Sequence, residues 1–316
     1  MTLVGFVVHT GRPQAVDSAA SLVEWLRARG VTTRSLSDEA VGADEKADTE
    51  AFAEGVNLVV SVGGDGTLLR AADLARRADA ALLGVNVGRL GFLTAVEPAA
   101  APALLALALE GRAPVEERMA IEAIPEGCPW ERRLWALNEV MAEKRARHRL
   151  VTMAVFVDGE YLTTLSGDAV IVATPTGSTA YSFSARGPIV TPRLDAILLT
   201  PVSPHMVFDR SLTLDPDEEV ALEVRGEEPG LVSADGRPSV EFPIGARVRI
   251  RRSDRRARLV RPVDGPSFYR LLREKFDLPV DHLRGGSGGV ARPGEHPDRP
   301  PPASEPPKGR APGREG

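Results

Sequence analysis

Apolar residues follow two patterns along the first hundred positions of the chain. Short stretches of strand length, apolar or alternating with polar residues, occur at 4–8, 31–36, 58–62 and 81–87. Between them, apolar residues recur three and four positions apart at 15–29 and 68–78, the spacing of one helix face. Strands that alternate with helices predict a parallel sheet covered on both faces, with ligands at the carboxyl ends of its strands. Residues 37–54 are acidic and poorly patterned, and we expect a loop there with room for a short helix.

The pattern changes after residue 97. Residues 98–109 are rich in Ala and Leu and predict a helix that leaves the first domain. Beyond it, short strand-like runs are separated by Gly, Pro and Asp turns, at 119–124, 151–157, 169–173, 196–200 and 248–252. No long helical pattern interrupts them. We therefore expect an α/β domain over residues 1–97 and an antiparallel β domain over residues 98–265.

The C-terminal part divides into a helix and a tail. Phe268, Leu271, Leu272 and Phe276 share one face of a predicted helix, and we expect residues 266–283 to pack back on one of the domains. Residues 284–316 consist largely of Arg, Pro, Gly, Glu and Ala. Such a segment buries too little apolar surface to offset its ordering entropy, so we expect a disordered tail.

The turn Gly63-Gly64-Asp65-Gly66-Thr67 joins a predicted strand to a predicted helix. Free N–H groups and the positive dipole end of a helix make such a turn a natural phosphate site. Asp65 is the exception, because its carboxylate repels a phosphate unless a cation lies between them or unless it takes a proton from an attacking hydroxyl. Both uses belong to phosphoryl transfer. The alternative is that Asp65 or Thr67 is only the N-cap of the helix.

A second polar group lies in the β domain. The run Thr174-Pro175-Thr176-Gly177-Ser178-Thr179 supplies hydroxyls and N–H groups around a glycine, a suitable lining for a nucleotide. Asn138-Glu139 stands between two apolar segments, and an amide beside a carboxylate suits ribose hydroxyls or an adenine edge. A Ser/Thr-rich hairpin turn and a solvated strand end are the alternatives at these two places.

Composition narrows the class of protein. The 316 residues are 43% hydrophobic, enough for two ordinary domains, and 39 basic against 44 acidic residues give a net charge of −5. This balance does not favour a nucleic-acid or anionic-membrane partner. Cys128 is the single cysteine, which excludes an internal disulfide and suits a reducing, cytoplasmic compartment. We expect no membrane span, because no uncharged apolar stretch approaches the length of roughly 20 residues that one needs. We also expect no dedicated transition-metal site, because the five histidines lack ligand spacing.

Taken together, several motifs resemble the NAD kinase family in order and spacing. They are Gly63 to Thr67, Asn86 to Thr94, Asn138-Glu139, Asp168 to Ser184, Pro204-His205 and Asp235-Gly236. The first motif alone is weak, since lipid kinases and phosphofructokinases carry similar loops, but the combination is specific. The resemblance covers roughly residues 1–276. It implies an α/β N-terminal domain, a β-sandwich C-terminal domain with the site between them, and a homodimer or homotetramer.

The resemblance also implies a reaction and its residues. Family members phosphorylate the 2′-hydroxyl of the adenosine ribose of NAD with ATP or polyphosphate, and Mg²⁺ is the divalent cation to expect. Asp65 matches the family's general base, Gly66 and Arg70 match positions near the nucleotide, and Asn138 with Glu139 matches the pair that holds NAD. Further dinucleotide contacts match Arg149, Asp168, Thr176, Thr179, Ala180, Tyr181, Ser182, Phe183 and Ser184.

Two departures from the family pattern add positive charge. Arg186 stands where a glycine is usual, so the backbone there must accept a side chain, and Arg237 follows Asp235-Gly236 where a glutamine is common. Two other functions compete with the NAD kinase interpretation. A lipid kinase would need a membrane-facing apolar or basic surface, and a catalytically silent NAD-binding sensor would keep the motifs without turnover.

Overall fold

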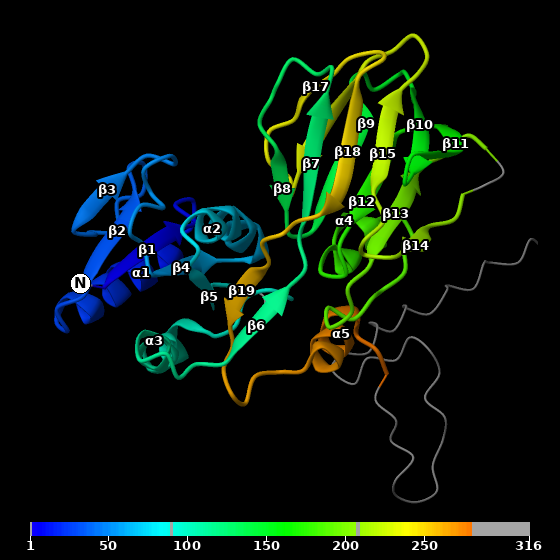
Figure 1. Cartoon of the computed structure of the whole chain (residues 1–316). Coiled ribbons are helices and arrows are strands. Elements are labelled where there is room, and N and C mark those ends of the chain that lie inside the picture. Colours follow the sequence, from blue (N-terminus) through cyan, green and yellow to red (C-terminus); the bar gives the residue numbers. More distant parts are fainter. Residues whose placement is uncertain (1, 89–90, 207–208, 280–316) are drawn as a thin grey trace, which may run out of the picture. The chain divides into compact units, whose positions relative to one another are not determined.

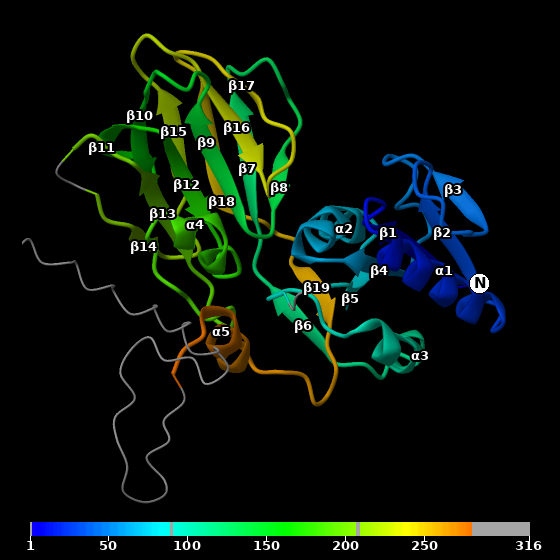
Figure 2. The same ribbon diagram turned by 180° about the vertical axis from the view of Figure 1, so that it is seen from behind.

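A computed structural model describes residues 2–88, 91–206 and 209–279. The chain divides into two compact units, residues 1–272 and 273–316. The first unit contains three sheets and all but one of the helices in full, and Figures 1 and 2 show it from opposite sides. The expected tail over residues 284–316 lies outside the described residues.

The first sheet has seven strands in the order β3-β2-β1-β4-β5-β19-β6. All neighbours pair in parallel except β6, which is antiparallel to β19. The bounds are β1 Leu3–Val8, β2 Thr32–Leu36, β3 Glu45–Ala47, β4 Leu58–Gly63, β5 Ala81–Asn86, β6 Val115–Arg118 and β19 Ala257–Val260. Its helices are α1 Pro13–Arg27, α2 Asp65–Arg77, η1 Pro98–Ala100 and α3 Ala101–Leu109. The predicted α/β domain is thus confirmed.

The two faces of this sheet are covered by different helices. Alternate residues of the central strands face opposite ways, so Phe6 packs in one buried cluster with α1 and α3, whereas Val7 packs in another with α2. The α2 cluster also contains Trp135 and Leu137, which lie in and just after β8 (Leu134–Ala136). Helix α2 therefore shares one apolar core with the sheet on one side and with the β domain on the other.

Two six-stranded antiparallel sheets form the β domain, in the orders β11-β10-β15-β18-β7-β8 and β14-β13-β12-β9-β16-β17. The remaining strands of the first are β7 Ile121–Glu126, β10 Val151–Val157, β11 Glu160–Gly167, β15 Val220–Val224 and β18 Arg247–Arg252. Those of the second are β9 Glu139–Lys144, β12 Ala169–Ala173, β13 Ile197–Val202, β14 Leu212–Leu214, β16 Gly230–Ala234 and β17 Val240–Phe242. Side chains from both sheets fill one core, so the expected β-sandwich is confirmed.

The chain crosses between the two domains twice. Strands β6 and β19 fall within residues 98–265, the range expected for the second domain, and yet both pair in the first sheet. Sequence patterns report local periodicity and carry no information on which distant strand a segment pairs with. The domain limits at residues 97 and 265 stay a prediction.

Short helices complete the structure. The turn after β12 contains η2 Gly177–Thr179 and α4 Tyr181–Ser184, and α5 spans Phe268–Phe276 as expected. Within the first unit, the ring of Phe268 lies 6.1 Å from that of Phe92, and Leu271 is buried. The full extent 266–283 stays a prediction, because residues 280–283 lie outside the described residues. In the second unit, the described residues 273–279 carry the end of α5.

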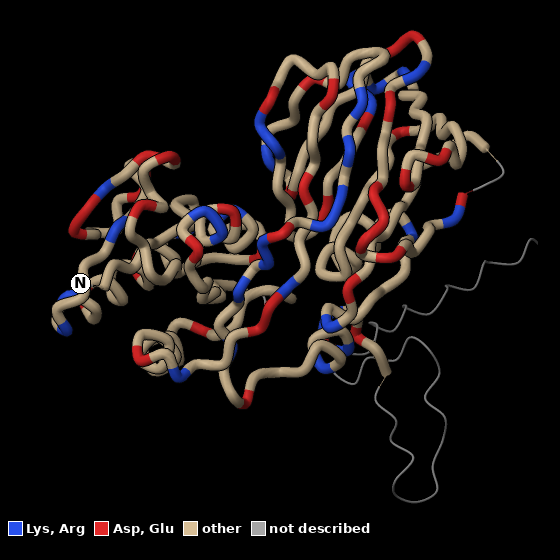
Figure 3. The backbone as a smooth tube through the Cα atoms, in the orientation of Figure 1, with Lys and Arg blue, Asp and Glu red and all other residues tan. Residues whose placement is uncertain are grey.

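Charge is mixed over the described part of the chain. Figure 3 shows Lys and Arg interspersed with Asp and Glu on both domains. No helix of the described residues is long and apolar enough to cross a membrane.

Arg186 has a backbone conformation that favours glycine. Its φ is +65°, in the left-handed region, which explains why a glycine is usual at this position. We expect Arg186→Gly to raise the free energy of unfolding by about 0.5–1 kcal/mol, because the left-handed strain outweighs the entropy that glycine adds to the unfolded chain. A urea unfolding midpoint measures this. Arg186→Ala, which keeps the Cβ atom, is the control and should differ little from the wild type; equal midpoints for both variants would contradict this account.

Candidate active site

The glycine turn sits at the carboxyl end of β4, in the middle of the first sheet. Gly64 is the N-cap residue of α2 and makes no side-chain capping bond, so the alternative in which Asp65 or Thr67 caps the helix is wrong. Gly63 has no room for a side chain, since a Cβ atom there would lie 2.5 Å from Thr67 Oγ1. The turn therefore begins α2 with exposed backbone N–H groups, as a phosphate site needs.

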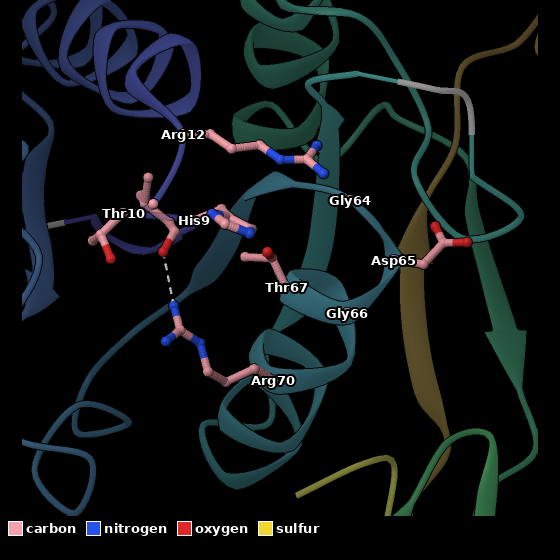
Figure 4. Close-up of a pocket in the computed structure, with 10 residues that line it drawn as sticks. His9, Thr10, Arg12, Gly64, Asp65, Gly66, Thr67 and Arg70 are labelled. Atoms are coloured by element: carbon pink, nitrogen blue, oxygen red, sulfur yellow. Dashed lines mark hydrogen bonds between the residues drawn. The ribbon is translucent and has the colours of Figure 1, made fainter.

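A cavity of about 540 Å³ opens over this turn. Its walls are the end of β1 with the loop that follows it, and the first turns of α2, and its lining residues are Val8, His9, Thr10, Gly11, Arg12, Gly64, Asp65, Gly66, Thr67 and Arg70. Figure 4 shows His9, Arg12 and Arg70 on one side of the turn. Two guanidinium groups and the helix N-terminus make this cavity suitable for a polyanion.

Arg12 and Thr10 were not predicted from the sequence as site residues. Arg12 Nη1 donates to the carbonyl of Val87 at 2.7 Å, and a Cβ atom on Gly88 would lie 2.8 Å from the same nitrogen. The guanidinium is therefore held between the ends of β1 and β5. The only sequence signal was the predicted parallel sheet, whose strands all end at one edge; that the loop at 9–12 follows a neighbour of β4 is known from the structure.

The carboxylate of Asp65 points away from His9, Arg12 and Arg70 (Figure 4). It accepts three consecutive backbone N–H groups: Phe92 at 2.8 Å on Oδ2, and Leu93 at 3.2 Å and Thr94 at 3.4 Å on Oδ1. Gly91 must lack a side chain, because a Cβ atom there would lie 1.9 Å from Oδ1. A carboxylate has about four acceptor positions. Oδ2 accepts one hydrogen bond from the described residues and keeps one acceptor position.

Asn138 and Glu139 are held in the same manner by a second carboxylate. Asp235, in the turn after β16, accepts the N–H groups of Leu137 at 2.8 Å, Asn138 at 2.8 Å and Glu139 at 3.1 Å. The side-chain atoms Asn138 Oδ1 and Glu139 Oε2 are buried and have no hydrogen-bond partner within the described residues. They are two of seven such atoms among the described residues, and their position in consecutive residues makes this a candidate place for a polar ligand.

Burial and the nearby charge of Asp235 raise the pKa of Glu139 to about 8. At neutral pH its carboxyl group is therefore mostly protonated. In that form it offers one O–H donor and an acceptor, the pair that a sugar diol can use.

The hydroxyl-rich turn lies against this pair. The N–H and the hydroxyl of Thr174 donate to the carbonyls of Asn138 and Leu137 at 2.8 and 2.6 Å. A Cβ atom on Gly177 would lie 2.1 Å from the Asn138 carbonyl oxygen, so glycine permits the close approach. The hydroxyls of Ser178 and Ser182 form hydrogen bonds inside the fold, with the carbonyl of Pro175 and the hydroxyl of Thr200. Tyr181, Phe183 and Ser184 are exposed, and Thr179 and Ala180 are half-buried.

A series of polar contacts joins the loop at 92–94, which Asp65 anchors, to the hydroxyl-rich turn. Arg261 donates to the Leu93 carbonyl at 2.7 Å and pairs with Glu116 at 2.7 Å. Glu116 also pairs with the buried Arg118 at 2.9 Å, and Arg118 donates to Thr176 Oγ1 at 3.3 Å. Burial by itself raises the pKa of Glu116, but the two arginines outweigh it and the net shift is downward. A continuous run of polar contacts therefore links Leu93 in the first domain with Thr176 in the β domain.

Asp168 and Arg149 lie elsewhere. In the register of β9 and β12, Glu139 faces Ala173, whereas Asp168 precedes the other end of β12 and pairs with Lys144. Five strand residues separate the two carboxylates, a distance of about 17 Å. Arg149 is exposed and pairs with Glu228 at 3.4 Å. Neither residue is brought to the Asn138-Glu139 pair within this chain.

Glu139 generates a testable pH dependence. A carboxyl group whose folded-state pKa is raised stabilises the fold fully below its unfolded pKa, and this stabilisation is lost as pH rises through the folded value. Relative to Glu139→Gln, the wild type should therefore lose on the order of 1–3 kcal/mol of unfolding free energy between about pH 5 and pH 9. Urea unfolding at both pH values measures it. Exposed Glu160→Gln is the control, and a pH-independent difference between wild type and Glu139→Gln would contradict the assignment.

Comparison with known proteins gives one consistent result. The family descriptions "ATP-NAD kinase N-terminal domain" and "ATP-NAD kinase C-terminal domain" match residues 4–113 and 137–262. An NAD kinase of Thermobifida fusca is 43% identical over 302 residues, covering 88% of this chain and 90% of its own. An NAD kinase of Mycobacterium tuberculosis is 38% identical over 298 residues, covering 88% and 97%.

Solved structures agree with the sequence matches. The structure of an NAD kinase from Archaeoglobus fulgidus in complex with ATP superposes with a TM-score of 0.68 at 26% identity, covering 87% of this chain and 98% of that one. Yeast NADH kinase complexed with NADH gives a TM-score of 0.81 at 21% identity and 90% coverage of both chains, a likeness of fold.

Proposed function

The chain belongs to the NAD kinase family, and on that premise we propose that it transfers the terminal phosphoryl group of ATP to the 2′-hydroxyl of the adenosine ribose of NAD, giving NADP. It is an NAD kinase enzyme by its relatives, and ATP as donor is supported by the ATP complex of the archaeal family member. The alternatives of a lipid kinase and a silent sensor have no comparable support.

One observation carries the assignment of the acceptor. Asn138 Oδ1 and Glu139 Oε2 belong to consecutive residues and are buried without partners among the described residues, and we assign the two adjacent hydroxyls of a ribose to them. In this proposal Thr176, Thr179, Ala180, Tyr181, Phe183 and Ser184 supply the contacts to the adenine and the remaining dinucleotide, whereas the buried hydroxyl of Ser182 stays bonded to Thr200. The exposed face of Tyr181 suits stacking on a base.

The donor belongs on the other side of the glycine turn. Arg12, Arg70 and the N–H groups at the start of α2 line the cavity and neutralise phosphate oxygens there. Asp65 lines the donor cavity and accepts hydrogen bonds from the loop at 92–94. Its free acceptor position on Oδ2 takes the proton of the 2′-hydroxyl as the new O–P bond forms and the bond to the leaving ADP breaks.

Mg²⁺ belongs to the donor in this proposal. Among the described residues, no three His, Cys, Asp or Glu side chains gather in a way that could hold a metal ion. Mg²⁺ commonly binds through substrate phosphates and water, so the donor itself supplies the ligands, and the bound ion neutralises phosphate charge. Polyphosphate offers the same phosphate groups and is the alternative donor.

The placement of Asp168 and Arg149 supports the homodimer or homotetramer that the family resemblance implies. Both residues match dinucleotide contacts of the family, yet they lie too far from Glu139 to contact the same ribose. A second copy of the chain could present them to the other half of the dinucleotide. We propose a cytoplasmic location, consistent with a single cysteine and no membrane-spanning helix in the described residues.

Asp65→Asn removes the proposed general base and also replaces one anchoring oxygen with an NH2 group that cannot accept a loop N–H, so it needs a control with the same loss. We expect turnover of NAD to fall by roughly 100-fold or more, because the amide cannot take the proton, while NAD binding changes little. NADP formation with ATP, and in parallel with polyphosphate, measures turnover, and calorimetry measures NAD binding.

Asp235→Asn is the matched control. It makes the same chemical change in a carboxylate that also accepts three N–H groups but lies outside the path of the proton. It should raise the KM for NAD with a much smaller effect on kcat. Near-normal turnover by Asp65→Asn would contradict the general-base role, and absence of NADP with either donor in the wild type would contradict the function.

A further inference from the structure

Glu39 is a buried carboxylate that the proposed reaction does not use. It follows β2 in the loop at 37–44, and its residue surface is completely inaccessible to solvent. An ionised carboxylate is costly to bury unless it is paired and hydrogen-bonded. The hydrogen-bond partners of Glu39 therefore indicate its role.

Both carboxylate oxygens contact elements that line the donor cavity. Oε2 accepts the N–H of Val8 at 3.0 Å, at the end of β1. Oε1 accepts from Nη2 of Arg70 on α2 at 2.5 Å, and the same nitrogen donates to the Val8 carbonyl at 2.8 Å. Val8, Glu39 and Arg70 thus close a ring of three hydrogen bonds. This ring ties the strand that leads to His9 and Arg12 to the helix that starts at the glycine turn.

The ring leaves part of Arg70 available. All its hydrogen bonds within the described residues come from Nη2, and 44% of its side-chain surface is exposed. Arg70 lines the cavity, so Nε and Nη1 remain for a ligand there. A long side chain of this kind otherwise loses rotamer entropy when it binds, and fixing it beforehand reduces that cost.

We propose that Glu39 is a positioning residue for the donor: it holds the guanidinium of Arg70 at the edge of the cavity, where Arg70 contacts the donor phosphates. This proposal rests on the proposed function and adds a residue of that same site. Glu39 touches neither substrate, so its effect passes through Arg70. A purely structural role, tying β1 to α2, would affect stability and both substrates alike.

The charge state of Glu39 adds a second readout. Burial raises its pKa to about 7, with the nearby charge of Asp38 acting in the same direction, whereas the Val8 N–H and the charge of Arg70 oppose the rise. The groups that face Glu39 are thus Arg70 from α2, the Val8 backbone from β1 and Asp38 from its own loop. Ionised Glu39 pairs with Arg70, and protonated Glu39 does not. Donor binding should therefore improve as pH rises through neutrality.

The experiment compares the full-length wild type with Glu39→Gln, Arg70→Gln and the double variant. Glu39→Gln should raise the KM for ATP by roughly tenfold, the worth of one charge-assisted hydrogen bond, with kcat and the KM for NAD nearly unchanged. The double variant should be no worse than Arg70→Gln alone, because both substitutions remove the same interaction.

The pH profile distinguishes positioning from structure. The ratio of kcat/KM for ATP in the wild type to that in Glu39→Gln should rise between about pH 6 and pH 8 and then level off, since ionisation of ATP cancels in the ratio. Asp38→Asn is the control: it removes a neighbouring charge without touching Arg70, and it should move the midpoint to lower pH while leaving the KM for ATP within about twofold.

Three results would overturn the proposal: an unchanged KM for ATP in Glu39→Gln, a ratio that is constant with pH, or equal rises in the KM values of ATP and NAD. Calorimetric titration of each variant with ATP alone repeats the test without turnover. If the wild type forms no NADP, the proposed function fails; if it forms NADP and Glu39→Gln matches it, only the role of Glu39 fails.

Discussion

Two carboxylates, each bonded to three consecutive backbone N–H groups, hold the loops on which the site depends. Asp65 accepts the N–H groups of residues 92–94, and Asp235 accepts those of residues 137–139. A buried N–H without a partner costs on the order of 1–3 kcal/mol, so each loop has one favourable position relative to its carboxylate. The first loop belongs to the α/β domain and the second to the sandwich. Backbone hydrogen bonds therefore fix each loop within its own domain.

The same arrangement lets one carboxylate anchor a loop and, in the proposed reaction, act as the base. Asp65 uses three of about four acceptor positions on the loop, and the remaining one lies on Oδ2. The loop bonds keep the carboxylate turned away from Arg12 and Arg70, the two cations that we assign to the donor (Figure 4). Helix α2 thus separates the two charges, because Asp65 is its first residue and Arg70 lies more than one turn later.

Local patterns predicted the fold well where periodicity was strong. The central strands, α1, α2 and α5 follow from apolar spacing, and the glycine turn follows from its place between β4 and α2. Strands β6 and β19 could not be assigned to the first sheet, because their pairing joins segments more than a hundred residues apart. Strand β3 lies within residues 37–54, where the sequence predicted a loop, and it was missed because it is only three residues long and polar.

The site residues also divide into those that a local motif marks and those that depend on long-range contacts. Asp65, Asn138 and Glu139 were accessible from motifs, because their residue types carry the chemistry. Arg12 was accessible only through its place at the end of a strand beside β4. Glu39 gave no signal, since its contact with Arg70 spans 31 positions and nothing in its own neighbourhood marks it as buried. Asp235 was named only as part of a motif, and its role as anchor depends on a turn that approaches residue 138 from almost a hundred positions away.

The central claim is that the Asn138-Glu139 pair presents one particular ribose hydroxyl of NAD to Asp65. The most direct measurement is the position of the new phosphate in the product, determined by NMR on material made by the purified chain from NAD and ATP with Mg²⁺. The account predicts a single product with the phosphate on the 2′-oxygen of the adenosine ribose. A phosphate on the 3′-oxygen or on the nicotinamide ribose, or a mixture of positions, would contradict it.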